Sequence, residues 1–383
     1  MTSPTPPSDP TVKAGEGAEG AWGARGLPPG LPRTPSPLGR VGIVMMSAIG
    51  DAVHVLPVIS ALKRHDPSCH VTWIVEPGPA SLVRGHPAVD ELLVFEKARG
   101  WRALADMRRM LATRPFDVLV DLQVYIKAGL VTALAHAPVK LGFDRARARD
   151  FNWLFTSRRI PPHAPQHVQD QYFEFLSALG VSPEPVVWSL GPWESERALQ
   201  LALLAPFGGP VATLVIGSSH PQKEWLPSRW AELADALHEQ FGLVTVLAGG
   251  NSAREQATAT EIVRLSRHRP HSTLGIPLRQ LVALLDGSAL VISLDTAPLH
   301  MAVALDRPVI SLMGYNNPKR VGPYRRFHDL IVDAYGDPGE NYPVSAAHRH
   351  DRMPRIQVRD VLERVARWEQ RYRDRPRSAS TRE

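Results

Sequence analysis

Two loops combine residue types that could act on a phosphorylated ligand. The first, Ser47-Ala48-Ile49-Gly50-Asp51-Ala52-Val53-His54, directly follows the apolar run Val41–Met46. Gly50 would let a ligand approach the backbone closely, and Asp51 could accept a proton as a general base. The alternative is structural, because aspartate is also a good N-cap for the helix that should follow.

The second loop is Leu294-Asp295-Thr296-Ala297-Pro298-Leu299-His300, at the end of an apolar run. We expect a helix that starts with Thr296 as its N-cap and a proline in its first turn. The free N–H groups and the dipole of such a helix end attract an anion, which His300 could also reach. The alternative is that Asp295 caps the helix and His300 is a core histidine.

Two further loops carry positive charge. Gly217–Trp225 contains Lys223, which could neutralise a phosphate or could be an ordinary surface lysine. Asp144–Asp150 sets three arginines at alternate positions. Their guanidinium groups suit a phosphate or a carboxylate, although the loop could simply be solvated.

Several kinds of site are not indicated. The chain has no Asp-x-Asp, Walker A, Gly-x-Ser-x-Gly or His-Glu-x-x-His motif, and its 15 histidines lack ligand spacing. We therefore expect no metal. The single cysteine, Cys69, excludes an internal disulfide framework and any cysteine-built metal site, so we expect a buried apolar role for it.

The elements that must position these loops alternate along the chain. We expect strands at Val41–Met46, Val71–Glu76, Leu92–Phe95, Val118–Leu122, Lys140–Phe143, Val211–Ile216, Val244–Ala248, Leu290–Leu294 and Val309–Met313. We expect helices at Trp101–Thr113, Ile126–Ala135, His167–Leu179, Ser228–Gln240 (capped by Ser228), Ala253–Ser266, Leu278–Leu285, Leu299–Ala304 and Val358–Arg373. Apolar strands joined through helices predict parallel sheets covered on both faces.

A break near residue 190 divides these elements into two doubly wound α/β domains, with ligands expected in the cleft at the carboxyl ends of the strands. We expect a disordered Pro- and Gly-rich extension at 1–38, domains at 39–190 and 191–350, and a closing helix with a basic tail at 351–383. We expect that last helix to pack across both domains.

Composition agrees with a globular protein. Hydrophobic residues make up 44% and charged residues 21% of the 383, with a formal net charge of +6. This surplus permits a phosphorylated substrate or an anionic membrane surface without requiring either. Since we find neither a long apolar segment nor a secretory signal, we expect a cytoplasmic protein.

The motifs taken together resemble glycosyltransferase family 9, the lipopolysaccharide heptosyltransferases, and heptosyltransferase I most closely. The resemblance runs from about Arg40 to about Tyr324. It rests on Val41–Asp51 with Val53-His54-Val55-Leu56-Pro57, Trp73–Pro77, His86–Asp90, Asp121-Leu122-Gln123 with Lys127, Gly142–Arg149, Lys223-Glu224-Trp225-Leu226-Pro227, Ser293–His300 and Gly322-Pro323-Tyr324.

The resemblance implies a GT-B fold and an inverting, metal-independent transfer of heptose from ADP-heptose to a Kdo-containing lipid A acceptor, at the cytoplasmic face of a membrane. It implies neither a cofactor nor a nucleic-acid or required protein partner. It assigns catalysis to Asp51 and Lys223, donor binding to Asp295, Thr296, Ala297, Pro298, Leu299 and His300, and acceptor binding to Ser47, Gly50, Lys127 and Arg149.

Two departures from the family pattern leave alternatives open. Ala297 stands where the family usually has glycine, and Met313-Gly314-Tyr315-Asn316-Asn317-Pro318 replaces the more usual Phe-Gly-Pro-Thr-Asp-Pro. The alternatives are a family 9 enzyme that moves another nucleotide-activated sugar to a surface glycan, a catalytically inactive nucleotide-binding homologue, and a GT-B-like sugar-nucleotide epimerase.

Overall fold

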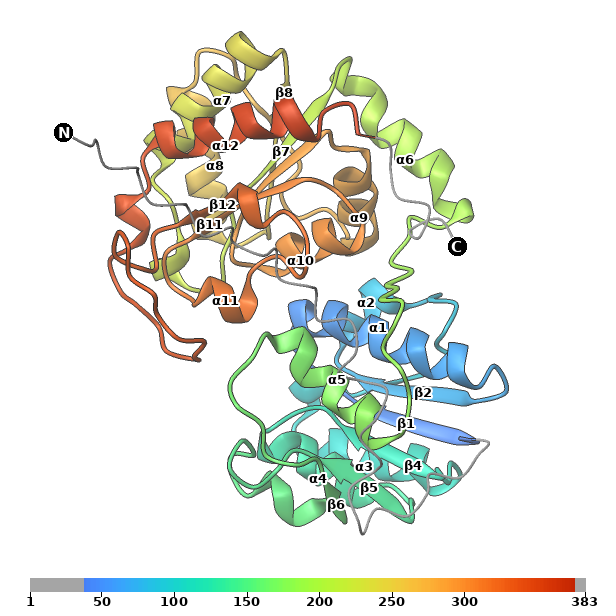
Figure 1. Ribbon diagram of the computed structural model, residues 1–383. Helices are drawn as coiled ribbons and strands as arrows, with labels where there is room; N and C mark the ends of the chain where they lie inside the picture. The colour runs from blue at the N-terminus through green and yellow to red at the C-terminus, as the bar shows by residue number, and fades with distance from the viewer. Residues whose placement is uncertain (1–37, 376–383) are drawn as a thin grey trace, which may run out of the picture. The chain divides into compact units, whose positions relative to one another are not determined.

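Two sheets of six parallel strands form the framework (Figure 1). The computed structural model describes residues 38–375. The expected extension at 1–38 lies outside that range except for Leu38, which is buried. The first sheet contains β1 (Arg40–Val44), β2 (His70–Val75), β3 (Glu91–Val94), β4 (Val118–Asp121), β5 (Val139–Gly142) and β6 (Arg158–Arg159). The second contains β7 (Val211–Val215), β8 (Val244–Ala248), β9 (His271–Ser272), β10 (Leu290–Leu294), β11 (Val309–Met313) and β12 (Ile331–Asp333).

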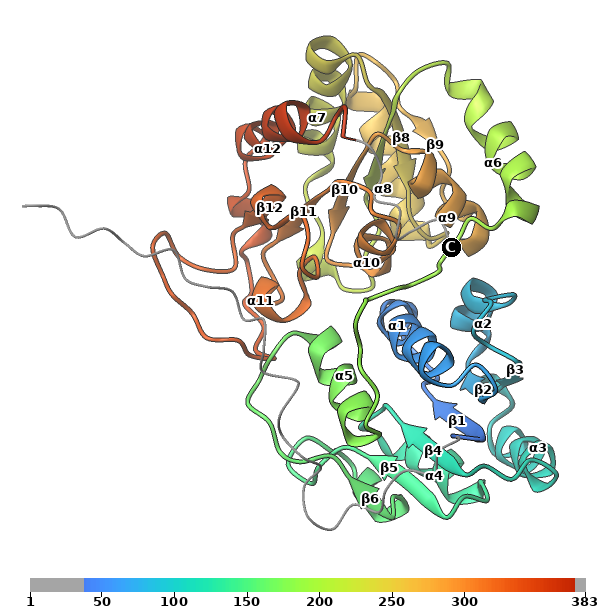
Figure 2. The same ribbon diagram turned by 45° about the vertical axis from the view of Figure 1, so that its right-hand side comes forward.

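The helices cover both faces of each sheet (Figure 2). In the first half they are α1 (Ile49–His65), α2 (Pro77–Val83), α3 (Trp101–Ala112), α4 (Ile126–Leu134) and α5 (Val168–Ala178). In the second half they are α6 (Arg197–Leu204), α7 (Pro227–Phe241), α8 (Ala253–Leu265), α9 (Leu278–Gly287), α10 (Ala297–Ala304), α11 (Pro318–Val321) and α12 (Val358–Arg371). Met107 of α3 and Val131 of α4 share one core cluster with Val44 and Leu119 of the sheet, whereas α1 and α5 belong to the other core.

Both sheets have the same topology. The first runs β3-β2-β1-β4-β5-β6, and the second, read from its other edge, runs β9-β8-β7-β10-β11-β12. In such sheets the strand order reverses between the first and fourth strands, and ligands bind beyond the carboxyl ends of that pair. The switch points therefore lie beyond β1 and β4 in one half and beyond β7 and β10 in the other. The Asp51, Lys223 and Asp295 loops follow three of these four strands.

Most expected elements are confirmed within two residues, and the differences have local causes. The three unpredicted strands, β6, β9 and β12, have only two or three residues each, too few to show a period of two. We also did not predict α2, α6 and α11. The first residues of α2, Pro77-Gly78-Pro79, are typical of a turn, and α6 and α11 have only eight and four residues. Ser228 is not an N-cap, because α7 begins one residue earlier at Pro227 with Leu226 in the cap position.

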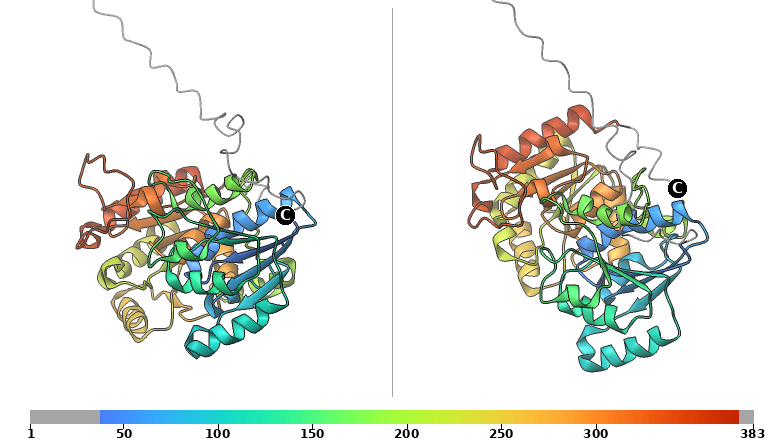
Figure 3. Two further views of the ribbon diagram at one scale, coloured as in Figure 1. Left: turned by 90° about the horizontal axis from the view of Figure 1, so that it is seen from below. Right: turned by 60° about the horizontal axis from the view of Figure 1, so that its bottom comes forward.

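The expected packing of the last helix across both domains is wrong. The apolar residues of α12, Val358, Val361, Val365 and Trp368, are buried against α7, β11 and β12 of the second half. The Trp368 indole donates to the Ala289 carbonyl at 3.2 Å. The views in Figure 3 also show α12 lying with the yellow and orange elements of that half.

Contacts between the two halves come from α1, α2 and α5 on one side and from α9, α10 and the 322–324 turn on the other. Helices α1 and α10 pack together, as do α2 and α9. The His167 ring, at the start of α5, lies 3.0 Å from the Gly322 carbonyl through Nε2, and the Tyr324 hydroxyl donates to Asp170 at 2.5 Å. Within residues 38–375, we find no helix that could span a membrane.

Candidate active site

The loop after β1 holds Asp51 in a fixed position. Because α1 begins at Ile49, Asp51 is the third residue of the helix and not its N-cap. Its carboxylate accepts a hydrogen bond from the Ala48 N–H at 3.1 Å and another from the Tyr172 hydroxyl at 3.1 Å. Burial raises the pKa of Asp51, while these two hydrogen bonds and the positive charge of Arg320 oppose the rise. A carboxylate with a raised pKa is a stronger base.

Gly50 brings the first and second halves into direct contact. A Cβ at this position would lie 3.3 Å from the His300 ring and 3.7 Å from the Ala297 Cα. The start of α1 therefore faces the start of α10, and the Asp51 loop lies beside the Asp295–His300 loop. These two motifs are 244 residues apart, as measured from Asp51 to Asp295.

Thr296 is the N-cap of α10, and Pro298 lies in the first turn, as predicted. The Thr296 hydroxyl donates to the Leu294 carbonyl at 3.4 Å and does not cap the helix. Asp295 does not cap it either, since none of the described side chains bonds to an N–H at this end. In this first turn Pro298 has no N–H and the Leu299 N–H donates to the Thr296 carbonyl at 3.0 Å, so the helix presents the Ala297 N–H and the positive end of its dipole to the region beside Gly50.

His300 packs within the contact between the halves. It is 9% exposed, and its ring centroid lies 4.3 Å from that of His54. Burial, together with the nearby His167 and Lys223, lowers the pKa of His300 to about 3. At neutral pH His300 is therefore an uncharged ring, which can donate or accept a hydrogen bond but adds no positive charge.

Lys223 is not a surface lysine. It ends the short 3₁₀ helix Pro221–Lys223, and its side chain is 16% exposed. Its ammonium lies 3.0 Å from an Asp295 carboxylate oxygen and donates to the Asp295 backbone carbonyl at 3.1 Å. The same carboxylate oxygen accepts a hydrogen bond from the Asn316 side chain. Lys223 is thus fixed at the end of β10, next to the start of α10.

The carboxyl end of β4 supports the loop after β1. The Gln123 side chain accepts the Met46 N–H at 3.0 Å and donates to the Ser47 carbonyl at 2.5 Å. Lys127, in the first turn of α4, lies 3.4 Å from the Ser47 hydroxyl and is ion-paired with Glu76. Ser47 and Lys127 therefore lie together, and Ser47 belongs to the loop that also carries Gly50 and Asp51.

The three arginines of the Asp144–Asp150 loop have different surroundings. Arg147 is held by Asp144 and by Glu174, the latter at 2.7 Å, so it braces the loop. Arg145 lies over the Trp153 ring, 4.3 Å from its centroid. The Arg149 side chain is exposed, and its backbone N–H donates to the Val124 carbonyl at 2.7 Å. The solvated interpretation is thus wrong for Arg147, and Arg149 has an accessible charge near the β4 end.

Our sequence interpretation missed Tyr172 and Asn316 as site residues. Tyr172 belongs to the apolar stripe of α5, which indicates only a core position. Asn316 lies in the 313–318 loop, whose sequence departs from the family pattern and therefore assigns no role to this residue. Among residues 38–375, no group of three or more His, Cys, Asp or Glu is arranged to hold a metal ion.

Comparisons with known proteins identify the family of the chain. The family model "Glycosyltransferase family 9 (heptosyltransferase)" matches residues 104–337. The chain belongs to glycosyltransferase family 9. It is 29% identical to the lipopolysaccharide core heptosyltransferase OpsX of Haemophilus influenzae, over 84% of this chain and 94% of that protein. It is 30% identical to lipopolysaccharide heptosyltransferase 1 of Salmonella typhimurium, over 74% and 91% of the two chains.

Solved structures share the fold of this glycosyltransferase. A family 9 glycosyltransferase from Veillonella parvula superimposes with a TM-score of 0.73 at 21% identity, over 86% of this chain and 97% of that one. The Escherichia coli heptosyltransferase WaaC with ADP gives 0.68 at 24% identity, over 86% and 99%. WaaC with ADP-2-deoxy-2-fluoro heptose gives 0.65 at 23% identity, over 86% and 99%. The expected GT-B fold is confirmed.

Proposed function

We propose that this family 9 enzyme transfers heptose from ADP-heptose to a Kdo-containing lipid A acceptor at the cytoplasmic face of a membrane, with inversion and without a metal. The observation that carries the proposal is the contact of Gly50 with His300 and Ala297, which brings Asp51 to the N-terminus of α10. The names of the curated relatives support the heptose and the lipopolysaccharide acceptor, and WaaC is solved with ADP and with a fluorinated ADP-heptose.

The second half provides the donor side. Negative charge develops on the diphosphate as the bond between the anomeric carbon and its oxygen breaks. Lys223, the Ala297 N–H and the dipole of α10 are fixed in advance to stabilise that charge, which is the arrangement that catalyses most effectively. Asp295 holds Lys223 in place, and His300, which is neutral, can hydrogen-bond to the donor. Thr296, Ala297 and Pro298 border the diphosphate, whereas the Leu299 side chain is fully buried and can only support this turn from the core.

The first half provides the acceptor side. In an inverting reaction the acceptor hydroxyl attacks the anomeric carbon from the face opposite the leaving diphosphate. As the new C–O bond forms, the hydroxyl proton passes to Asp51, and ADP leaves with the electron pair of the broken bond. Ser47 and Gly50 border this position, and the cationic groups of Lys127 and Arg149 suit the carboxylates and phosphates of a Kdo-lipid A acceptor.

One observation favours a second candidate, transfer of a different nucleotide-activated sugar. Asn316, from the loop that departs from the family pattern, bonds directly to the Asp295 carboxylate. The part of the site that lies near the donor sugar therefore has its own hydrogen-bond arrangement. A donor other than ADP-heptose would keep the roles of Asp51 and Lys223.

A thermal-shift titration tests the donor. We expect ADP-heptose to stabilise the protein without added metal, by about 2.7 kcal/mol at one hundred times its Kd, and UDP-glucose and UDP-GlcNAc to have no effect. ADP should give a smaller shift than ADP-heptose. Stabilisation by a uridine donor alone, or by none of these nucleotides, would contradict the proposed donor.

Tyr172 gives a prediction about pH dependence. Protonated Asp51 cannot act as a base, so kcat/KM should fall as the pH drops through the Asp51 pKa, which burial raises. Tyr172→Phe removes a hydrogen bond that favours the ionised carboxylate. We therefore expect the acid limb of the pH profile to move to higher pH in this variant.

The matched control is Tyr324→Phe. It removes a hydroxyl that bonds Asp170 in the same contact between the halves and does not touch Asp51. Measured side by side, the pH profiles should show a displaced acid limb in Tyr172→Phe alone. An equal displacement in both variants would mean that Tyr172 acts only through the stability of the contact.

A further inference from the structure

One part of the first half exposes an unusual amount of apolar surface. Ten large apolar residues are well exposed among residues 38–375, and five of them lie between positions 125 and 154. They are Tyr125 (50% exposed), Ile126 (44%), Leu130 (38%), Phe151 (66%) and Leu154 (59%). Large apolar patches on a protein surface usually mark an interaction site.

These residues lie on, or directly before, two segments that pack together. The segments are α4 and the 3₁₀ helix η2 (Asn152–Phe155), and the Phe155 ring packs so closely on Gly129 that a Cβ there would lie 2.4 Å away. The exposed residues of α4, Ile126, Leu130 and Ala133, follow one another at intervals of four and three, which places them on one side of the helix. We call this surface the α4–η2 face.

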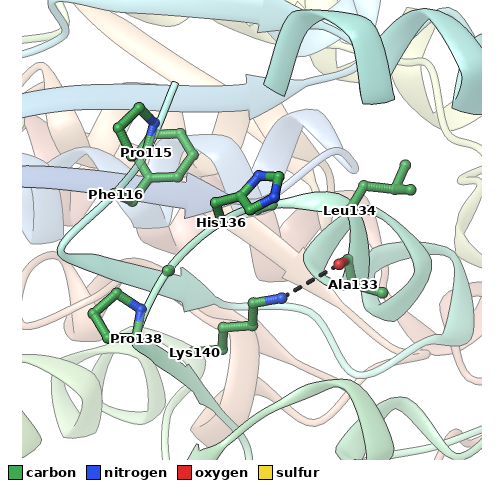
Figure 4. Close-up of a pocket in the computed structure, with 9 residues that line it drawn as sticks. Pro115, Phe116, Ala133, Leu134, His136, Pro138 and Lys140 are labelled. Carbon is green, nitrogen blue, oxygen red and sulfur yellow. Dashed lines mark hydrogen bonds between the residues drawn. The ribbon is translucent and has the colours of Figure 1, made fainter. Parts of the chain in front are cut away.

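A hollow extends the α4–η2 face at the far end of α4 (Figure 4). It has a volume of about 560 Å³ and is lined mainly by apolar side chains, among them Phe116 and Leu134. Lys140 also lines it and donates to the Ala133 carbonyl at 3.3 Å. The apolar surface therefore continues past the last turn of α4 and has a cationic group within it.

Positive charge surrounds the α4–η2 face. Residues 122–159 contain seven Lys and Arg but only two acidic residues, Asp144 and Asp150, whereas the whole chain has a formal net charge of +6. Arg145, Arg149 and Arg159 are exposed. Arg145 and Arg159 both lie over the Trp153 ring, with their guanidinium carbons 4.3 Å and 5.6 Å from its centroid.

We propose that the α4–η2 face docks on an anionic lipid bilayer. Its apolar side chains enter the boundary between head groups and acyl chains, and its arginines and lysines face the lipid phosphates. An arginine-rich surface around exposed Phe, Leu and Ile is the composition that binds such an interface.

A second copy of this chain is a poorer occupant. In a symmetric dimer the same patch meets itself, so the surplus positive charge of residues 122–159 would face an identical surplus. Like charges across an interface oppose association. An anionic membrane has the opposite charge and also accepts the apolar residues.

The location of the α4–η2 face deepens the proposed function, on which this step of the inference rests. Ile126 directly precedes Lys127, which contacts the Ser47 hydroxyl, and Ser47 belongs to the loop that holds Asp51. A protein docked through this face would therefore turn its acceptor side toward the lipid layer. A lipid-linked acceptor could then reach Asp51 without leaving the bilayer.

Vesicle co-sedimentation of the full chain, without donor or acceptor, tests the docking. We expect binding to vesicles that contain phosphatidylglycerol and little binding to phosphatidylcholine alone. Binding should weaken as salt rises from about 0.1 M to about 1 M, over which the Debye length falls from about 10 Å to about 3 Å. Equal binding to both vesicle types, or binding to neither, would contradict the proposal.

Paired variants locate the docking surface. We expect the double variant Phe151→Asn with Leu154→Asn to weaken vesicle binding at least about tenfold. The double variant Arg145→Gln with Arg159→Gln should weaken vesicle binding about fivefold for each arginine removed. Asparagine suits position 151, where φ is +61°. The matched control, Leu199→Asn with Leu201→Asn on α6, removes two exposed leucines from the second half and should bind as the unmodified protein does. If the control loses binding equally, or if the Phe151 and Leu154 variant keeps it, the proposed location is wrong.

Two more measurements distinguish membrane docking from dimerisation and from a failure of the proposed chemistry. If sedimentation velocity shows a dimer that Phe151→Asn with Leu154→Asn dissociates, the face is an interface between copies and the proposal fails. Turnover with a deacylated, soluble acceptor should be unchanged in that variant, whereas turnover with a vesicle-embedded acceptor should fall. Failure of the proposed donor or acceptor would abolish turnover in both assays and leave vesicle binding intact.

Discussion

Replacing Asp51 with asparagine should lower kcat by about 10²–10⁴-fold, the usual contribution of a general base, and leave the affinity for ADP nearly unchanged. The amide has almost the same shape: its oxygen can still accept the Ala48 N–H, and its NH2 group can donate to the Tyr172 hydroxyl oxygen in place of the second carboxylate oxygen. It cannot take the proton of the acceptor hydroxyl. The loss should therefore appear in single-turnover transfer, and calorimetry with ADP should show an intact donor site.

The control for Asp51 is Asp170→Asn. It makes the same change of carboxylate to amide in the contact between the halves, where Asp170 accepts the Tyr324 hydroxyl. We expect its kcat to fall by less than about tenfold, because it removes only one hydrogen bond, worth about 1 kcal/mol or somewhat more. If Asp51→Asn turned over at the unmodified rate, or no more slowly than Asp170→Asn, the base would have to be another group.

The second large effect concerns Lys223. We expect Lys223→Met to lower kcat by about 10²–10³-fold, as does removal of other groups that stabilise a developing negative charge, typically worth about 2.7–4 kcal/mol. The variant also leaves the Asp295 carboxylate without its ammonium partner, which by itself destabilises the protein. A fall in activity alone would therefore be ambiguous.

A double variant resolves this ambiguity. Lys223→Met with Asp295→Asn removes both charges of the pair, so we expect it to recover much of the thermal stability that Lys223→Met loses. Its turnover should stay low, because the diphosphate still lacks its cation. Recovery of turnover together with stability would show that Lys223 serves only to neutralise Asp295.

Sequence patterns predicted the parallel-sheet framework and the positions of the loops that we propose as the site. The strands β1, β7 and β10 belong to continuous apolar runs, and small or polar residues follow each run: Ser47, Gly217 and Asp295 come first. Because the carboxyl ends of parallel strands share one edge, the position of each loop follows from that of its strand. The resemblance to family 9 then assigned roles to Asp51, Lys223 and the Asp295–His300 motif.

Pairing across long distances in the sequence was not predictable from residue types. The ion pair of Lys223 with Asp295 and the hydrogen bond from Tyr172 to Asp51 join residues 72 and 121 positions apart. Periodicity describes each helix separately and therefore could not reveal that α5 places a hydroxyl against α1. The predicted packing of α12 across both halves was wrong for a related reason. An apolar stripe shows that a helix is buried, but it does not show which half buries it.

The most direct test of the central claim is a transfer assay with the purified full-length protein, ADP-heptose and Kdo-lipid A in the presence of EDTA. Mass spectrometry would detect the gain of one heptose by the acceptor, and NMR would give the configuration of the new linkage. We expect a single heptose to be added, with its anomeric configuration inverted and with the Asp51→Asn variant nearly inactive. No transfer from ADP-heptose, or retention of configuration, would contradict an inverting heptosyltransferase with Asp51 as its base.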